Sequence, residues 1–226
     1  MYRYETHMHT LPVSKCARQG VRQNLEFYAS LGYDGIFITN HFLDGNINID
    51  KSLPYEEQLE FYFSDYYEAL KLSKEIGIKV FLGIEISYRG TDFLIYGLDK
   101  EWFLAHPEIM DMKKSDELAF LIENGALVIQ AHPYREAPYI PEVIIYPDCC
   151  EAFELYNAHN KPEINAKAVA YAAEHGIHGT GGTDAHGPVQ KRGGMIFEKK
   201  WESIADYIAA VRSGTGYRII TEFVER

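Results

Sequence analysis

Histidine and carboxylate residues recur where short hydrophobic segments of this sequence end. The chain contains nine histidines. Imidazole and carboxylate side chains bind divalent transition metals, and they also transfer protons in catalysis. Five separate segments end in such residues, which indicates a metal centre assembled from several strands. The residues concerned are His7, His9, His41, Glu85, His132, Asp184 and His186.

Two of these segments carry closely spaced pairs of ligand residues. His7 and His9 are one residue apart, so on a strand both imidazoles point to the same side. Asp184 and His186 have the same spacing, and they follow Gly181-Gly182-Thr183, where glycine allows a close approach of the backbone. Each pair alone is also compatible with hydrogen-bonded histidines of a core, or with a turn capped by Asp.

Glu85 is the most informative single carboxylate. It follows the apolar run Phe81-Leu82-Gly83-Ile84, and carboxylates are almost never fully buried without a partner. Glu85 therefore requires a cation or a network of hydrogen-bond donors. His41 and His132 also follow apolar runs, and for each of them a hydrogen-bonded place in the core is the alternative.

Segments that position these residues follow a regular alternation. Short apolar runs, rich in β-branched and aromatic residues, predict strands over residues 2–9, 35–41, 79–87, 92–98, 127–132, 151–157 and 178–184. Amphipathic stretches predict helices over 18–31, 55–76, 115–124, 163–175 and 202–213. Such alternation is typical of parallel strands with right-handed crossovers, whose carboxyl ends open onto one face.

Overall composition limits the class of protein. The chain has 226 residues, 46% of them hydrophobic, and a formal net charge of −11. These values predict one domain over residues 1–226. The acidic balance opposes sequence-independent binding to long nucleic acids. No apolar run approaches the roughly 18 residues that span a bilayer, and no leader segment is visible, so we expect a soluble, cytoplasmic protein without a membrane partner.

The pattern of cysteines, and the absence of several known motifs, exclude some classes of site. Cys16, Cys149 and Cys150 form neither an even set nor a C-x-x-C pair. This pattern is typical of a reducing compartment, and it predicts no zinc site built on thiolates. The sequence also lacks phosphate-binding, dinucleotide-binding and nucleophilic-serine motifs, so we expect no nucleotide cofactor.

Five motifs together resemble those of the PHP superfamily, the polymerase and histidinol phosphatase domains. They are Glu5-Thr6-His7-Met8-His9-Thr10 followed by Ser14, Ile38-Thr39-Asn40-His41, Gly83-Ile84-Glu85, Ala131-His132-Pro133 and Gly182-Thr183-Asp184-Ala185-His186. The resemblance covers nearly the whole chain in the family's order. It implies an α/β fold, a distorted seven-stranded (β/α) barrel similar to a TIM barrel, with two or three divalent metals (Zn, Mn or Fe) at the strand carboxyl ends.

Carried over by position, the resemblance assigns ligands to each metal. The first ion would be bound by His7, His9, Glu85 and Asp184. Glu85 would bridge it to a second ion bound by His132. The third ion would be bound by His41 and His186. The sequence departs from the family pattern at three places. Lys15 lies nearest to the place of a further histidine, Asn40 replaces an aspartate, and Asp92 is closest to a missing second-metal histidine. An ammonium cannot bind a metal, so we expect Lys15 to supply charge in place of a third cation.

Residues and resemblance together predict a metal-dependent phosphoesterase, a phosphatase or phosphodiesterase. The expected substrate is a small phosphomonoester, as for histidinol phosphatases or nucleotide phosphatases. Bridged metals would lower the pKa of water and hold the attacking and leaving oxygens, while Asp184 or His186 would transfer the proton. The residues predicted to contact substrate are Lys15, Arg18, Arg135, His159 and Arg192.

Two other functions fit the same pattern. A metal-dependent amidohydrolase or deaminase would use the same barrel mouth, and it would release ammonia or an amine instead of phosphate. A non-catalytic metal-binding module of the same family would be inactive with Mn, Fe and Zn.

Overall fold

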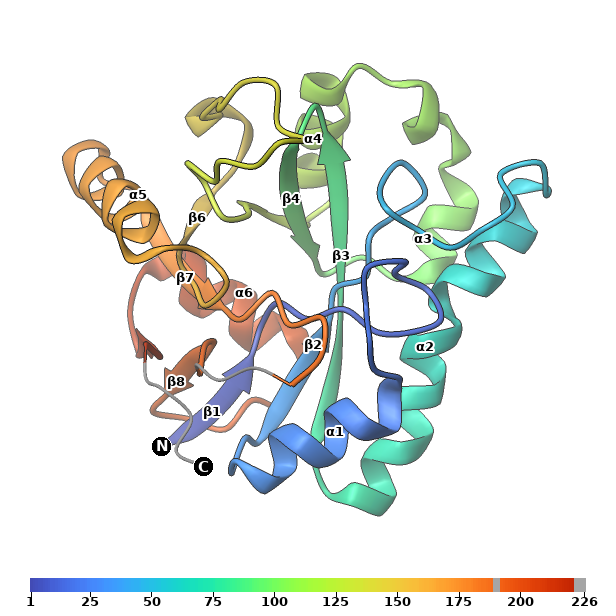
Figure 1. Cartoon of the computed structure of the whole chain (residues 1–226), viewed down its shortest axis with the longest axis horizontal. Helices are drawn as coiled ribbons and strands as arrows, with labels where there is room; N and C mark the ends of the chain where they lie inside the picture. Colours follow the sequence, from blue (N-terminus) through green and yellow to red (C-terminus); the bar gives the residue numbers. More distant parts are fainter. Residues whose placement is uncertain (189–191, 222–226) are drawn as a thin grey trace.

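Nine strands form one curved sheet in the part of the chain that the computed structural model describes, residues 1–188 and 192–221 (Figure 1). Their order across the sheet is β7-β6-β5-β4-β3-β2-β1-β8-β9. The strands are β1 (Tyr2–Glu5), β2 (Gly35–Ile38), β3 (Lys79–Tyr88), β4 (Thr91–Tyr96), β5 (Leu127–Gln130), β6 (Ala152–Asn157), β7 (His178–Gly182), β8 (Met195–Phe197) and β9 (Tyr217–Ile219).

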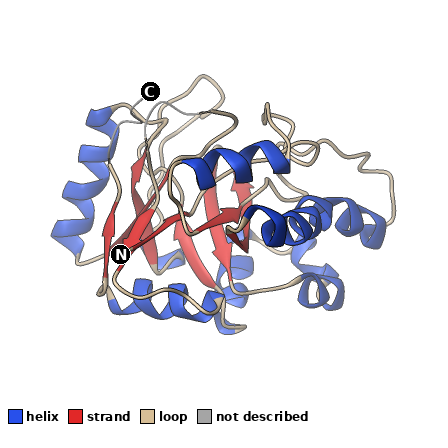
Figure 2. Ribbon diagram, turned by 90° about the horizontal axis from the view of Figure 1, so that it is seen from below, coloured by secondary structure: helices blue, strands red, loops and turns tan. Residues whose placement is uncertain are grey.

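Helices lie around this layer of strands (Figure 2). The α-helices are α1 (Val21–Ser30), α2 (Tyr55–Ile76), α3 (Lys100–Ala105), α4 (Lys114–Glu123), α5 (Pro162–His175) and α6 (Ile204–Ser213), with short 3₁₀ turns at η1 (Pro107–Asp111) and η2 (Pro147–Cys149). Within the described residues, no helix combines the length and the apolar character that a membrane crossing requires.

The sheet curls nearly into a barrel because the segments that follow β1 and β7 meet. Met8 and Ala185 form a parallel backbone bridge. The His9 amide donates to the Ala185 carbonyl at 2.8 Å, and the Thr6 hydroxyl donates to the Gly181 carbonyl at 2.6 Å. The two ends of the β1–β7 series are therefore joined at the mouth of the barrel.

Helix α2 shows why the sequence pattern located the helices well. The expectation over residues 55–76 coincides with its observed span. Its buried side includes Leu59 and Phe63, spaced one helical turn apart. Gly77 ends the helix in the left-handed conformation, with φ at 82°, which glycine adopts without the steric cost of a Cβ.

Among the strands that the sequence predicted, the expectation of parallel pairing is wrong at β4. Strand β4 runs antiparallel to both β3 and β5. A two-residue loop, Arg89-Gly90, joins β3 to β4, and both of its residues have positive φ. This is the geometry of a tight hairpin. Because β4 is reversed, its first residues lie at the same mouth as the carboxyl ends of its neighbours.

The expected count of seven strands is also corrected. Strands β8 and β9 extend the sheet beyond β1, where β8 pairs antiparallel with β1 and β9 pairs with β8. Each has only three residues, too few for a period-two pattern to be visible in the sequence. Helix α3 was likewise not predicted.

An aromatic cluster fills the space between the first strands and α6. Tyr4 stacks on Trp201 with ring centroids 3.6 Å apart, and Phe37 packs against Tyr96 and Tyr207. All five side chains are buried. The Tyr96 hydroxyl donates to the Thr6 carbonyl at 2.7 Å, so this cluster supports the segment that leads into His7.

Candidate metal centre

Apart from Glu85, which lies within β3, the predicted ligands lie just beyond the strands rather than at their last residues. Strand β1 ends at Glu5, β2 at Ile38, β5 at Gln130 and β7 at Gly182. Single backbone bridges continue the pairing into the following segments, between Met8 and Ala185 and between His41 and Glu85. The mouth of the barrel thus holds the ligand-bearing segments against one another.

Glu85, on β3, lies at the centre of the group. Its Oε1 is 3.1 Å from His7 Nε2 and 3.4 Å from His132 Nε2. Its Oε2 is 3.3 Å from His9 Nε2 and 2.8 Å from His41 Nδ1. Each oxygen faces two imidazoles, which is the arrangement of a carboxylate able to bridge two cations.

Asp184 completes one side of this group. Its Oδ1 lies 3.1 Å from His9 Nε2 and 3.4 Å from His7 Nε2. Its Oδ2 accepts a hydrogen bond from Arg135 Nη1 at 2.7 Å. The charge of Arg135 therefore fixes one oxygen, and the other faces both histidines of the first pair.

Hydrogen bonds on the far side of three rings orient their inner nitrogens. Glu154 Oε1 lies 2.9 Å from His7 Nδ1. The Ser14 hydroxyl is 3.1 Å from His9 Nδ1, and the Asp184 carbonyl lies 2.8 Å from His186 Nδ1. Such contacts select the tautomer and leave Nε2 available as a ligand. The sequence places Glu154 near the end of a predicted strand at this mouth, but it was not among the predicted site residues, although a carboxylate within the apolar strand β6 carries the same signal as Glu85.

A second buried network holds the segment between His9 and Cys16. The side-chain Oδ1 of Asn40 accepts from the Thr10 backbone amide at 2.7 Å and from the Ser14 hydroxyl at 2.8 Å. The side-chain Nδ2 of Asn40 donates to Asp65 Oδ2 at 3.1 Å, and the Thr10 hydroxyl donates to the same oxygen at 2.6 Å. An aspartate at position 40 would have no donor for Asp65, so the departure from the family pattern matches its surroundings.

The group fits divalent metals. Four of its buried polar atoms make no hydrogen bond: His7 Nε2, His9 Nε2, His41 Nδ1 and Glu85 Oε2. All four point into the shared space between the rings and the carboxylates. Buried donors and acceptors without partners are costly, and coordination by cations would satisfy every one of them.

Electrostatics at the mouth favour the ligand forms of His9, Glu85 and Asp184, whereas the carboxylates around His7 and His41 outweigh burial and raise the pKa of both imidazoles. Burial, together with the charge of His41, lowers the pKa of His9 to about 3, which keeps its imidazole neutral. Burial opposes ionisation of Glu85, but His41 and His7 hold its pKa well below the usual range. Arg135 has the same effect on Asp184.

Backbone geometry at the mouth is constrained. His132 and Asp184 have positive φ, at 30° and 55°, a conformation that non-glycine residues rarely adopt outside functional sites. A Cβ on Gly182 would lie 2.5 Å from the His7 Cβ and 2.6 Å from Glu154 Oε1. Glycine is therefore required there, as the close approach expected from the sequence implied.

Of the residues expected to contact substrate, Arg135 and His159 lie at or beside the mouth. Arg135 lines the cavity at the mouth, and its guanidinium also donates to Asn157 and Asn160 at 3.0 and 2.9 Å. His159 is exposed beside the same mouth, 2.7 Å from the Thr183 carbonyl through Nδ1.

The other three cationic residues do not line this cavity. Lys15 and Arg18 are exposed at the edge of the mouth. The Arg18 amide donates to the His186 carbonyl at 2.6 Å. Arg192 is half-buried and lies near Tyr33.

Cys16 was given no role by the sequence, whereas Asp92 was expected closest to the place of the missing second-metal histidine. Both line the mouth cavity, which has a volume of about 660 Å³. Asp92 Oδ2 is 3.6 Å from His132 Nε2. Burial raises the pKa of the Cys16 thiol, but hydrogen bonding to His186 and His41 outweighs it and lowers that pKa to about 7. A single cysteine in a sequence has no spacing pattern, so its neighbours were not predictable.

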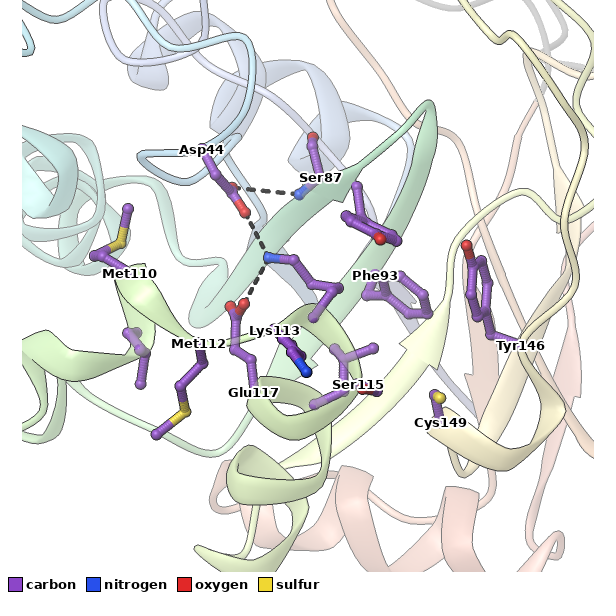
Figure 3. Close-up of a pocket in the computed structure, with 14 residues that line it drawn as sticks. Asp44, Ser87, Phe93, Met110, Met112, Lys113, Ser115, Glu117, Tyr146 and Cys149 are labelled. Carbon is purple, nitrogen blue, oxygen red and sulfur yellow. Dashed lines mark hydrogen bonds and ion pairs between the residues drawn. The ribbon is translucent and has the colours of Figure 1, made fainter.

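A second cavity, which we call the side chamber, adjoins the mouth. Its volume is about 540 Å³, and it shares Asp44 and Ser87 with the mouth cavity. Figure 3 shows Phe93, Met112 and Tyr146 on its walls. The lining of the side chamber combines apolar and aromatic side chains with Lys113, Ser115 and an ionic group described below.

Three comparisons place the fold among known proteins. No protein-family model and no curated protein matches the sequence. Among solved structures, a two-domain protein from Bacteroides vulgatus, described as containing a predicted PHP-like metal-dependent phosphoesterase, matches with a TM-score of 0.71 at 15% identity. That match covers 100% of this chain and 66% of the other, so the chain spans less than two thirds of it.

Two further structures share the fold. An amidohydrolase from Chromobacterium violaceum matches with a TM-score of 0.58 at 13% identity, over 97% of this chain and 98% of that one. The lesion-specific endonuclease PfuEndoQ from Pyrococcus furiosus matches with a TM-score of 0.55 at 16% identity, over 96% and 57%. The chain therefore has the barrel of PHP-like and amidohydrolase-type proteins.

Proposed function

We propose that this chain, which shares the fold of proteins described as PHP-like metal-dependent phosphoesterases, hydrolyses phosphate esters with bound divalent metals. The observation that carries the proposal is Glu85, buried with each carboxylate oxygen facing two imidazoles. Such metals, when bound, supply a nucleophile from water at neutral pH and neutralise the phosphate. The ligands we assign are His7, His9, His41, Glu85, His132, Asp184 and His186.

The remaining groups at the mouth position the ligands and transfer protons. Arg135 orients Asp184 through the 2.7 Å contact to Oδ2, which leaves Oδ1 directed at the histidines and at a metal bound between them; Asp184 is the first candidate for proton transfer. His186 lines the same cavity and is the second candidate for proton transfer. His159, Arg18 and Lys15 are exposed beside the mouth, and we assign them to the first contacts with an entering phosphate. Arg192 does not line the mouth cavity.

The expected substrate is a small phosphomonoester with an apolar organic group. The phosphate would lie in the mouth cavity and the organic group in the side chamber, because the two cavities share Asp44 and Ser87. A net charge of −11 opposes long polyanions. One protein of the same fold is a DNA endonuclease, so duplex DNA belongs in the test.

The test is a screen of a phosphate-ester panel with metal-free protein reloaded separately with Mn²⁺, Fe²⁺ and Zn²⁺. We expect phosphate release from small monoesters and little cleavage of duplex DNA at physiological salt. Release of ammonia from an amide or amine panel, without phosphate release, would instead favour the amidohydrolase function. Inactivity with all three metals on both panels would contradict an enzymatic role.

A further inference from the structure

A potential sulfur ligand, Cys16, lies at one side of the mouth. Cys16 Sγ and ring nitrogens of His9, His41 and His186 all lie within 4.8 Å of one another. The His9 ring centroid is 4.5 Å from those of both His41 and His186. Four potential ligand atoms from three parts of the chain thus surround one point.

The backbone fixes the position of Cys16. The Lys15 amide donates to the Asn46 carbonyl at 2.9 Å, the Ala17 amide to the Ser14 carbonyl at 3.1 Å, and the Arg18 amide to the His186 carbonyl. The residues on both sides of Cys16 are tied to other segments of the mouth, and Cys16 itself lines the cavity. By contrast, the Lys15 side chain is exposed.

Independent evidence for a ligand comes from the histidines. His9 is fully buried, and its Nε2 has no hydrogen-bond partner. His41 Nδ1 also lacks one. His186 Nδ1 is bonded to the Asp184 carbonyl, so its Nε2 is the nitrogen available to a ligand. His9 Nε2 and His41 Nδ1 face only carboxylate oxygens, at 3.1 Å from Asp184 Oδ1 and 2.8 Å from Glu85 Oε2, an arrangement that cations bound between them would stabilise.

We propose that Cys16 supplies a thiolate ligand, with His41 and His186, to a metal position distinct from the one between His7, Glu85 and Asp184. Thiolate and imidazole ligands favour Zn²⁺ over harder cations such as Mg²⁺ or Mn²⁺. Binding forms the S–Zn bond and releases the Sγ proton to solvent. The sequence expectation of no thiolate zinc site is replaced by this proposal. With His186 engaged, Asp184 remains for proton transfer.

The proposal rests on the proposed function in that both place metals at the mouth of the barrel. Its test measures metal binding and does not require activity. Metal-free protein is titrated with Co²⁺, which reports thiolate coordination by a sulfur-to-cobalt charge-transfer absorption in the near ultraviolet. We expect this absorption in the wild type and in Cys149→Ser, and its loss in Cys16→Ser. Cys16→His should keep the number of bound ions without the absorption.

A measurement on the wild-type protein covers the case in which the Cys16 variants fail to fold. Alkylation is followed at each cysteine by peptide mapping, with and without Zn²⁺. We expect Zn²⁺ to slow alkylation of Cys16 about tenfold or more, since coordination removes the free thiolate, and to leave Cys149 unchanged. No charge-transfer absorption in the wild type, or equal Cys16 alkylation with and without Zn²⁺, would overturn the proposal. Phosphate release with neither signature would overturn this proposal alone.

Discussion

At the scale of single residues, Glu85 is a buried carboxylate whose negative charge requires positive charge close by. It is 1% exposed, and four imidazoles surround its two oxygens. Neutral imidazoles can each donate one proton, but His7 and His9 already direct Nδ1 to Glu154 and Ser14. Only His41 Nδ1 and His132 Nε2, at 2.8 and 3.4 Å, remain as donors to Glu85, which makes this carboxylate sensitive to substitution.

We expect Glu85→Gln to lower the turnover of the best ester found in the screen by more than about a hundredfold, because ligand loss exceeds the 10–100-fold typical of outer-shell changes. Metal content should fall in parallel, and the far-ultraviolet circular dichroism should stay that of the wild type. Glu151→Gln is the matched control, since Glu151 pairs with Arg212 away from the mouth. Wild-type turnover in Glu85→Gln would show that Glu85 is not a ligand.

At the scale of elements, the periodicity of apolar residues predicted helix spans that depend on the local sequence. The span of α2 was predicted correctly because its apolar side repeats along the helix and Gly77 follows directly after its last residue. The direction of β4 was missed because a two-residue hairpin loop, Arg89-Gly90, carries little pattern. The predicted ligand residues lie together, but Glu154 and Cys16 were not assigned, since their roles depend on neighbours from distant segments.

Helix α4 contains an ionic group whose pH dependence tests the packing of the side chamber. Lys114 Nζ lies 2.8 Å from Asp44 Oδ2 and 2.6 Å from Glu117 Oε2 (Figure 3). Glu117 is only 4% exposed. Burial raises its pKa from 4.5 to about 7, although Lys114 opposes the shift.

Because the folded-state pKa of Glu117 is raised, its contribution to stability is complete below about pH 4.5 and is lost as the pH rises through about 7. We expect this loss to be on the order of 2–3 kcal/mol. In urea unfolding of metal-free protein between about pH 5 and pH 8, Glu117→Gln should show a flatter dependence than the wild type. Glu123→Gln, at an exposed position of α4, should follow the wild-type curve; a Glu117→Gln curve parallel to it would contradict the raised pKa.

At the scale of the whole molecule, an acidic barrel presents a ligand-rich mouth beside the side chamber. The mouth cavity is about 660 Å³ and the side chamber about 540 Å³. Phe93, Ile109 and Leu118 contribute buried apolar surface to the chamber. Substrate preference should therefore depend on the size of the organic group as well as on the phosphate.

Filling the side chamber tests this dependence. We expect Met112→Trp to raise KM for phenyl phosphate roughly tenfold, the size of effect that a lost apolar contact produces, and to leave KM for methyl phosphate unchanged. Val169→Trp places the same side chain at a position of α5 that is 50% exposed, and it should change neither value. Equal effects of Met112→Trp on both substrates would exclude the side chamber as the site of the organic group.

The joining of the segments after β1 and β7 also has a consequence in time. Thr6 and Gly181, which meet there, are 175 residues apart in the chain. At a synthesis rate of about 5–20 residues per second, a ribosome makes this stretch in roughly 10–35 seconds. During that interval His41, Glu85 and His132 join His7 and His9, but Asp184, whose Oδ1 faces both of those histidines, is still to be made. We therefore expect the nascent chain to bind metal incompletely, and full loading to follow closure of the barrel. A chain interrupted before β7 would lack Asp184 and His186, and it should bind fewer ions than the finished molecule.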